Sequence, residues 1–211
     1  MSLEASEIYA AAQLNANAER VRLLAEYETA NTKRQHSQVI SRAASRFHTL
    51  FVNEMAPPWY GTQWDYNGTT TTPGVGKIAC GYFVTTLLRD TGVNLERVRL
   101  AQQASELIIK TLVTEQSIRR FSDSTMNDFV ENINAWGNGL YLVGLDNHVG
   151  FLSVDDEGFY FIHSSFVAPS YVIKEDAATS SVLASSRYKI VGKLDDSLFI
   201  HKWLNDETFK L

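Results

Sequence analysis

The sequence is poor in cysteine and proline and has no long apolar run. One cysteine, Cys80, among 211 residues excludes an internal disulfide and any metal site built from several cysteines. No apolar stretch reaches the roughly 20 residues that cross a bilayer, so we expect no membrane span. The opening residues, Met1 to Glu4, pass directly into polar sequence without a charged and then apolar signal segment.

Basic runs are also missing, and the formal net charge is -5. Nucleic-acid-binding proteins usually carry a basic patch, so we expect no nucleic-acid partner. Apolar residues make up 45% of the chain, which is ordinary for a packed core. The length fits one domain with an extension. We place the domain at residues 56–211 and a helical extension, packed on it, at residues 1–55.

The extension has neither glycine nor proline between residues 3 and 50 and is rich in Ala, Glu, Gln and Arg. This composition predicts helix, either as a hairpin that breaks in the polar segment 31–35 or as one long helix. His36 and His48 are isolated on this polar helix, so we expect them at the surface. Pro57-Pro58 ends the helical region, and an aromatic, glycine-rich loop follows over residues 57–76.

Cys80 stands at the predicted start of a helix. Phe83, Val84, Leu87 and Leu88 follow it at the spacing of one buried helical stripe, and Gly92 occupies the place of a C-terminal cap. The N–H groups of a helix start favour a thiolate, so the pattern predicts a lowered thiol pKa. The alternative is that Cys80 is a small, inert, buried residue.

The remainder of the chain changes from helical to strand patterns. Residues 94–121 predict a helix, and a short helix with a Ser or Thr cap follows up to Trp136. Short runs rich in Val, Leu, Phe and Tyr, separated by turn residues, then predict an antiparallel meander. The expected elements are strands at 140–145, 148–154 and 159–163, a short helix at 175–185, a strand at 187–194, and a covering turn at 202–204.

The meander brings two histidines together. If the turn at 155–158 pairs Val154 with Phe159, His148 and His163 become diagonal neighbours on one face, with Gly150 between them. Such a pair fits a catalytic base with its orienting partner, two metal ligands, or two core histidines. A metal needs further ligands, and no carboxylate is obviously placed there, so we expect no metal and no cofactor.

Thiol chemistry requires a base within hydrogen-bond reach and a third group that orients the base. Cys80, His148 and His163 supply these in chain order, and the aromatic loop could line a cleft beside them.

The motifs around these residues resemble those of the NlpC-type cysteine peptidases, bacterial cell-wall hydrolases of papain-like fold. The resemblance covers roughly residues 60 to 165. Ala79 replaces the usual Asp, Gly81 replaces the usual Ser, and the segment between Gly92 and Gly137 is long for the family. The matching segments are Trp64-Asp65-Tyr66-Asn67-Gly68, Ala79-Cys80-Gly81-Tyr82-Phe83-Val84, Gly139-Leu140-Tyr141-Leu142-Val143, His148-Val149-Gly150-Phe151 and Phe161-Ile162-His163-Ser164.

The resemblance implies an α+β, papain-like (NlpC-type) fold in which a nucleophile-bearing helix packs on an antiparallel sheet. It implies cleavage of an amide in peptidoglycan stem peptides by a Cys80-His148-His163 triad, with Trp64 or Tyr66 at the family's aromatic substrate position. It also favours an extracytoplasmic location. The alternatives are an acyl hydrolase or acyltransferase that uses the same triad on another substrate, and a catalytically silent binding module. The oligomeric state stays open.

Overall fold

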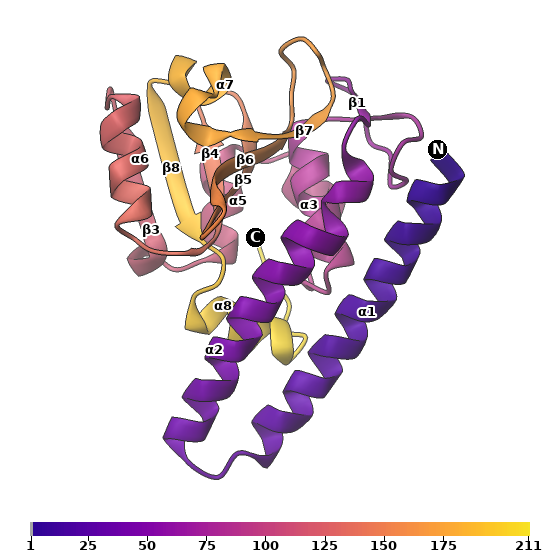
Figure 1. The fold of residues 1–211 in the computed structure, drawn as a ribbon, viewed down its shortest axis with the longest axis vertical. Coiled ribbons are helices and arrows are strands. Elements are labelled where there is room, and N and C mark those ends of the chain that lie inside the picture. Colours follow the sequence, from indigo (N-terminus) through magenta and orange to yellow (C-terminus); the bar gives the residue numbers. More distant parts are fainter. Residues whose placement is uncertain (1) are drawn as a thin grey trace.

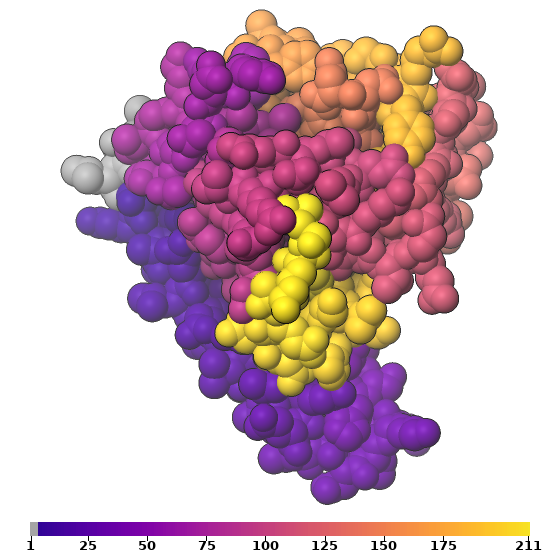
Figure 2. Space-filling model, turned by 180° about the vertical axis from the view of Figure 1, so that it is seen from behind, coloured from indigo at the N-terminus to yellow at the C-terminus, as the bar shows by residue number. Residues whose placement is uncertain are grey.

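The computed structural model describes residues 2–211, with side chains from Glu4 onward. It begins with an antiparallel hairpin of two helices, α1 (Ser2–Thr29) and α2 (Lys33–Leu50). Thr32 caps α2 by accepting a hydrogen bond from the Gln35 N–H. The predicted break over residues 31–35 is therefore a turn between two helices. The turn end of the hairpin projects beyond the rest of the molecule (Figures 1 and 2).

The hairpin packs on the domain through apolar side chains. Phe47 of α2 lies edge-on to Trp203 and Phe199 of helix α8 (Ser197–Leu204), with ring centroids 5.1 and 5.3 Å apart. This helix replaces the covering turn expected at residues 202–204. His48 is partly buried, and its Nε2 lies 2.8 Å from Ser153 Oγ, so the expectation of a plain surface position was wrong. α2 continues as a π-helical turn, Phe51–Met55, and a 3-10 turn, Pro57–Trp59.

A six-stranded antiparallel sheet forms the centre of the α+β domain, in the order β3-β8-β4-β5-β6-β7 (Figure 1). The predicted meander is confirmed, as is the strand near residue 190. The strands are β3 (Ile118–Ser122), β4 (Gly139–Leu145), β5 (Val149–Asp155), β6 (Gly158–Ser164), β7 (Val172–Asp176) and β8 (Tyr188–Lys193).

The two edge strands correct two sequence predictions. The helix expected over 94–121 is two short helices, α4 (Arg97–Ala101) and α5 (Ser105–Leu112), and a 3-10 turn (Glu115–Ser117), and residues 118–122 instead pair with β8. The helix expected over 175–185 begins as β7, because Val172 to Asp176 pair with β6. A 3-10 turn, Ala177–Thr179, and helix α7 (Ser181–Ser185) follow. Residues 118–122 are extended because they pair with β8, which is distant in sequence, whereas residues 172–176 pair with β6, the strand directly before them. In both cases strand pairing overrides local helix propensity.

Both faces of the sheet are covered by helices. Successive side chains of a strand point to opposite faces, so neighbouring residues join different clusters. Leu140 and Leu142 of β4 join the apolar cluster that also contains side chains of α3, α5 and the hairpin. Tyr141 and Val143 join a second cluster with side chains of α6 (Met126–Asn134) and α7. We call these the α3 face and the α6 face. The predicted helix ending near Trp136 is α6, and Thr125 caps it by accepting from the Asp128 N–H.

Helix α3 (Cys80–Asp90) confirms the predicted cysteine-bearing helix. Gly92 follows it with φ of 93°, and the Val93 N–H donates to the Leu88 carbonyl at 3.0 Å, so glycine closes the helix as expected. A two-residue parallel pair, β1 (Gln63–Trp64) and β2 (Lys77–Ile78), leads into α3. No helix within the described residues combines the length and the apolar composition that a membrane crossing requires.

Candidate active site

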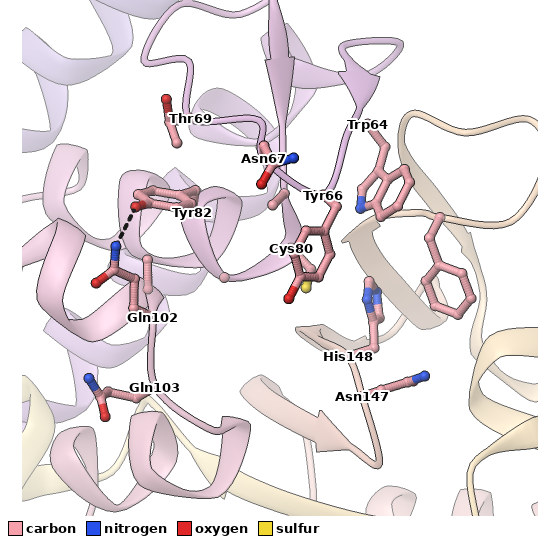
Figure 3. A pocket seen from close by; sticks show the side chains of 14 residues that line it. Trp64, Tyr66, Asn67, Thr69, Cys80, Tyr82, Gln102, Gln103, Asn147 and His148 are labelled. Carbon is pink, nitrogen blue, oxygen red and sulfur yellow. Dashed lines mark hydrogen bonds between the residues drawn. The ribbon is translucent and has the colours of Figure 1, made fainter.

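Cys80 opens α3 at the wall of a cavity of about 690 Å³ (Figure 3). Ala79 stands at the N-cap without a capping side chain, so the first N–H groups of the helix are not bonded by their own cap residue. Gly81 and Tyr82 continue the wall from the first turn. The other lining residues are Trp64, Tyr66, Asn67, Thr69, Ala79, Ala101, Gln102, Gln103, Asn147, His148 and Phe166.

The aromatic loop reaches the cavity because Gly68 lies directly on the strand before Cys80. A Cβ at Gly68 would stand 2.6 Å from the backbone of Lys77 and Ile78, so only glycine permits this approach. Both predicted substrate residues line the cavity as a result. Trp64 is half-buried with its ring centroid 6.3 Å from that of Phe166, whereas Tyr66 is 81% exposed.

The structure brings the two predicted histidines into direct contact. The expected register is present, with Val154 opposite Phe159. His148 directly precedes β5, and its Nε2 lies 2.8 Å from Nδ1 of His163. A Cβ at Gly150 would stand 2.8 Å from the His163 Cβ. The space that glycine leaves is therefore filled by the His163 stem and the neighbouring Phe161 ring.

Aromatic neighbours hold both imidazoles in place. The Phe161 ring stacks on His163 with centroids 3.9 Å apart. Phe166 lies edge-on to His148 at 5.3 Å. Both histidines are almost fully buried, so each ring has a fixed position before any ligand binds.

A carboxylate that the sequence prediction missed extends this contact. Glu175 Oε1 lies 3.2 Å from His163 Nε2, and the Ser180 hydroxyl donates to the same oxygen at 2.5 Å. Glu175 was assigned to a helix, whereas it lies on β7 opposite Phe161. The β-branched pair Val172-Ile173 just before it was the available signal for a strand.

The pKa of Cys80 differs from the expectation. Burial raises the pKa of Cys80, and hydrogen bonds from the backbone of Val149, Gly81 and Cys80 itself only partly offset it. The predicted lowering of this pKa was therefore wrong, because desolvation outweighs the helix start. Burial, with a smaller contribution from His163, lowers the pKa of His148 to about 3. The pair at neutral pH is thus a thiol and a neutral imidazole.

Gly81 is explained by the long segment that follows α3. A Cβ at this position would collide with the Ala101 carbonyl oxygen at the end of α4. The serine usual in the resembled family does not fit here without a shift of α4. The same approach of α4 places Gln102, which donates to the Tyr82 hydroxyl at 3.2 Å, on the wall of the cavity (Figure 3).

The cavity is uncharged. Among the residues that the structure describes, no Asp, Glu, Lys or Arg side chain lines it. A second cavity of about 260 Å³ shares Cys80 and His148 with the first and has an aliphatic floor that includes Ile108 and Leu145. Asp146 stands on the wall of this second cavity. Space for a ligand therefore extends to both sides of the thiol.

Comparisons with family models, curated proteins and solved structures return no match to this chain. The chemistry must therefore be argued from the site itself. No group of three or more His, Cys, Asp or Glu side chains within residues 4–211 is arranged to hold a metal ion. The groups present suit acid–base and nucleophilic chemistry: one thiol, two imidazoles in contact and one carboxylate behind them.

Proposed function

We propose that the protein is a cysteine hydrolase with a papain-like, NlpC-type core that cleaves an amide bond. The observation that carries the proposal is the position of Cys80 and His148 on the wall of one cavity, with His148 held by His163 at 2.8 Å. The backbone of Val149, next to His148, hydrogen-bonds the thiol. The base is therefore adjacent to the nucleophile, and it has the orienting partner that such chemistry requires.

The reaction begins with the neutral pair. His148 accepts the thiol proton as Cys80 Sγ bonds to the carbonyl carbon of the substrate, and the resulting imidazolium gives that proton to the leaving amine as the C–N bond breaks. Water then attacks the thioester, one of its protons passes through His148 to the departing sulfur, and the carboxylic acid leaves. The Cys80 N–H and the Asn67 side chain are the donors we assign to the oxyanion.

The resemblance points to peptidoglycan stem peptides as the substrate. The uncharged cavity favours an uncharged portion of the substrate next to the scissile bond, because a buried charge without a partner is costly. Trp64 and Tyr66 supply flat apolar surface for that portion. The same lining favours the second candidate function, an acyl hydrolase or acyltransferase that uses this triad on an uncharged ester, thioester or amide.

The deciding experiment is digestion of purified peptidoglycan followed by mass analysis of the fragments, beside a panel of uncharged acyl amides, esters and thioesters. Wild type is compared with Cys80→Ser, which is close in size and keeps the fold. We expect new fragments or released acids with wild type alone. Equal turnover by Cys80→Ser would exclude the cysteine mechanism. The wild-type protein could turn over none of these substrates, and its Cys80 could fail to react with an acylating reagent. That result would favour a catalytically silent binding module.

A further inference from the structure

We propose that Glu175 is a positioning residue that fixes the proton on each ring of the His163–His148 pair and so makes His148 Nδ1 the base. This inference deepens the proposed function and depends on it. Four groups lie in series: the Ser180 hydroxyl, the Glu175 carboxylate and the two imidazoles. The successive contacts measure 2.5, 3.2 and 2.8 Å.

The proton positions follow from the one group in the series that can only accept. Hydrogen bonds from His163 and from Ser180 lower the pKa of Glu175, so the carboxylate is ionised at neutral pH. It has no proton to donate, and His163 Nε2 must therefore carry the hydrogen of the 3.2 Å contact. In a neutral ring this leaves His163 Nδ1 as an acceptor, and His148 Nε2 must then donate across the 2.8 Å contact.

This arrangement leaves Nδ1 of His148 without a proton. With its hydrogen fixed on Nε2, the neutral imidazole presents its lone pair from the other ring nitrogen. The reverse arrangement, in which His163 Nδ1 donates to His148 Nε2, satisfies the same 2.8 Å contact but places the hydrogen on His148 Nδ1. That form cannot take a proton from Cys80. The two arrangements are equivalent for the histidine pair alone, and Glu175 selects the active one.

Glu175 is the group beside the histidine pair that selects between the two proton arrangements. His163 is fully buried, and its titratable neighbours are His148 before β5 and Glu175 on β7. Glu175 itself is partly exposed, with a side-chain exposure of 30%, and its bonded neighbours are His163 and Ser180. Burial lowers the pKa of His163, and the Glu175 carboxylate partly offsets this lowering, so the carboxylate favours the positive charge that the histidine pair gains during the reaction.

The first test reads the tautomers without any substrate. Protein labelled with ¹⁵N-histidine is studied by NMR through two-bond nitrogen–proton correlations, and His148→Gln and His163→Gln assign the signals. We expect hydrogen on Nε2 of both rings in wild type. Glu175→Ala should give a mixture or the reverse arrangement, whereas Glu175→Gln, whose amide oxygen can still accept, should keep the wild-type pattern. An unchanged pattern in Glu175→Ala would overturn the proposal.

The second test measures kcat/KM against pH on the substrate identified above. At metal sites, loss of the carboxylate that orients a histidine costs about 10–100-fold. By analogy we expect a loss of that size in kcat for Glu175→Ala, a smaller loss for Glu175→Gln, and little change in KM. The acid limb should move to lower pH in both variants, because removal of the carboxylate makes the imidazole a weaker base. A purely structural role would leave this limb in place.

Two controls separate failure of the inference from failure of the proposed function. Glu157→Gln removes an exposed carboxylate from the β5–β6 turn and should change neither tautomers nor rate. If His148→Ala retains full activity, the proposed function itself is wrong. If His148→Ala is inactive while Glu175→Ala has wild-type kinetics and a wild-type pH profile, the triad stands and the role of Glu175 is refuted.

Discussion

The two faces of the sheet differ in kind, and strand β6 shows the difference in two adjacent residues. Ile162 points to the α3 face, where the neighbouring side chains are apolar. His163 points to the α6 face and is equally buried, yet it contacts His148 and Glu175. One face therefore stabilises the fold through apolar contact, while this end of the other holds polar groups that must remain paired.

Cys80 and His148 reach the wall of the cavity from these different faces. Cys80 packs against the apolar cluster of the α3 face, whereas His148 shares its face with His163. They meet because His148 lies just before β5, at the end of the strand. A register slip of one residue would exchange Ile162 and His163 between the faces, so the same pattern that buries the core also places His163 beside His148.

The largest expected effect is on the polar side. His148→Ala removes the base, and general acid–base catalysis is worth roughly 10²–10⁴-fold. We expect kcat/KM to fall by at least that much, and the melting temperature to fall as well, because His163 Nδ1 loses its buried partner. Steady-state kinetics and thermal unfolding measure the two quantities. A variant that retains more than a tenth of the wild-type rate would show that His148 is not the base.

On the apolar side the expected effect is on stability. Ile162→Ala leaves a cavity in the α3 face and should lower the free energy of unfolding by about 2–5 kcal/mol. The rate per folded molecule should stay near wild type, because the side chain points away from the histidines. Urea unfolding and active-site titration provide the measurements. A large loss of rate with unchanged stability would contradict the separation of the two faces.

Two glycines permit a matched comparison of the faces. An added Cβ at Gly150 would meet Phe161 and His163, whereas one at Gly192 would meet Ile109 and Val113. Overpacking of this kind costs about 1–3 kcal/mol, so both alanine variants should lose similar stability. Only Gly150→Ala should also lose activity, since it displaces His163. Equal rates for the two variants, measured at a temperature where both are folded, would contradict the assigned geometry.

A further expected effect is a loss of stability in acid that needs no substitution. His148 has its pKa lowered to about 3 in the folded state, whereas an unfolded histidine titrates near 6.5. Below pH 6.5 the histidine binds a proton in the unfolded chain but stays neutral in the folded one. The free energy of unfolding therefore falls by about 1.4 kcal/mol per pH unit until the folded-state pKa of His148 is reached.

His148→Gln lacks this titration and isolates the contribution from other groups. Urea unfolding of both proteins between pH 7 and 4 should therefore show the smaller loss of stability in the variant. Parallel curves for wild type and variant would mean that His148 is not held neutral by burial.

The sequence was sufficient where structure depends on near neighbours. The helix from Cys80 with its Gly92 cap and the β5–β6 register follow from local patterns, and the register alone brought His148 beside His163. The helical composition of residues 3–50 was also visible, but it left a hairpin and one long helix both open. β3 was missed because its partner β8 is distant in sequence. β7 pairs with the preceding strand β6, and it was missed, together with Glu175, because its first residues were assigned to a helix despite the β-branched pair Val172-Ile173. The pKa of Cys80 was predicted in the wrong direction because a helix start is visible in sequence, whereas the burial around it is not.

The contact between Gly81 and the Ala101 carbonyl constrains how this chain can change by mutation. Serine at position 81 is incompatible with α4 where it now lies, so the residue and the segment after α3 form an epistatic pair. A mutational path that introduces serine at position 81 must first shorten or displace residues 101–104. In the opposite direction, glycine must be present before α4 can settle against the nucleophile helix. The position of the Ala101 carbonyl oxygen therefore decides the order in which such substitutions can occur.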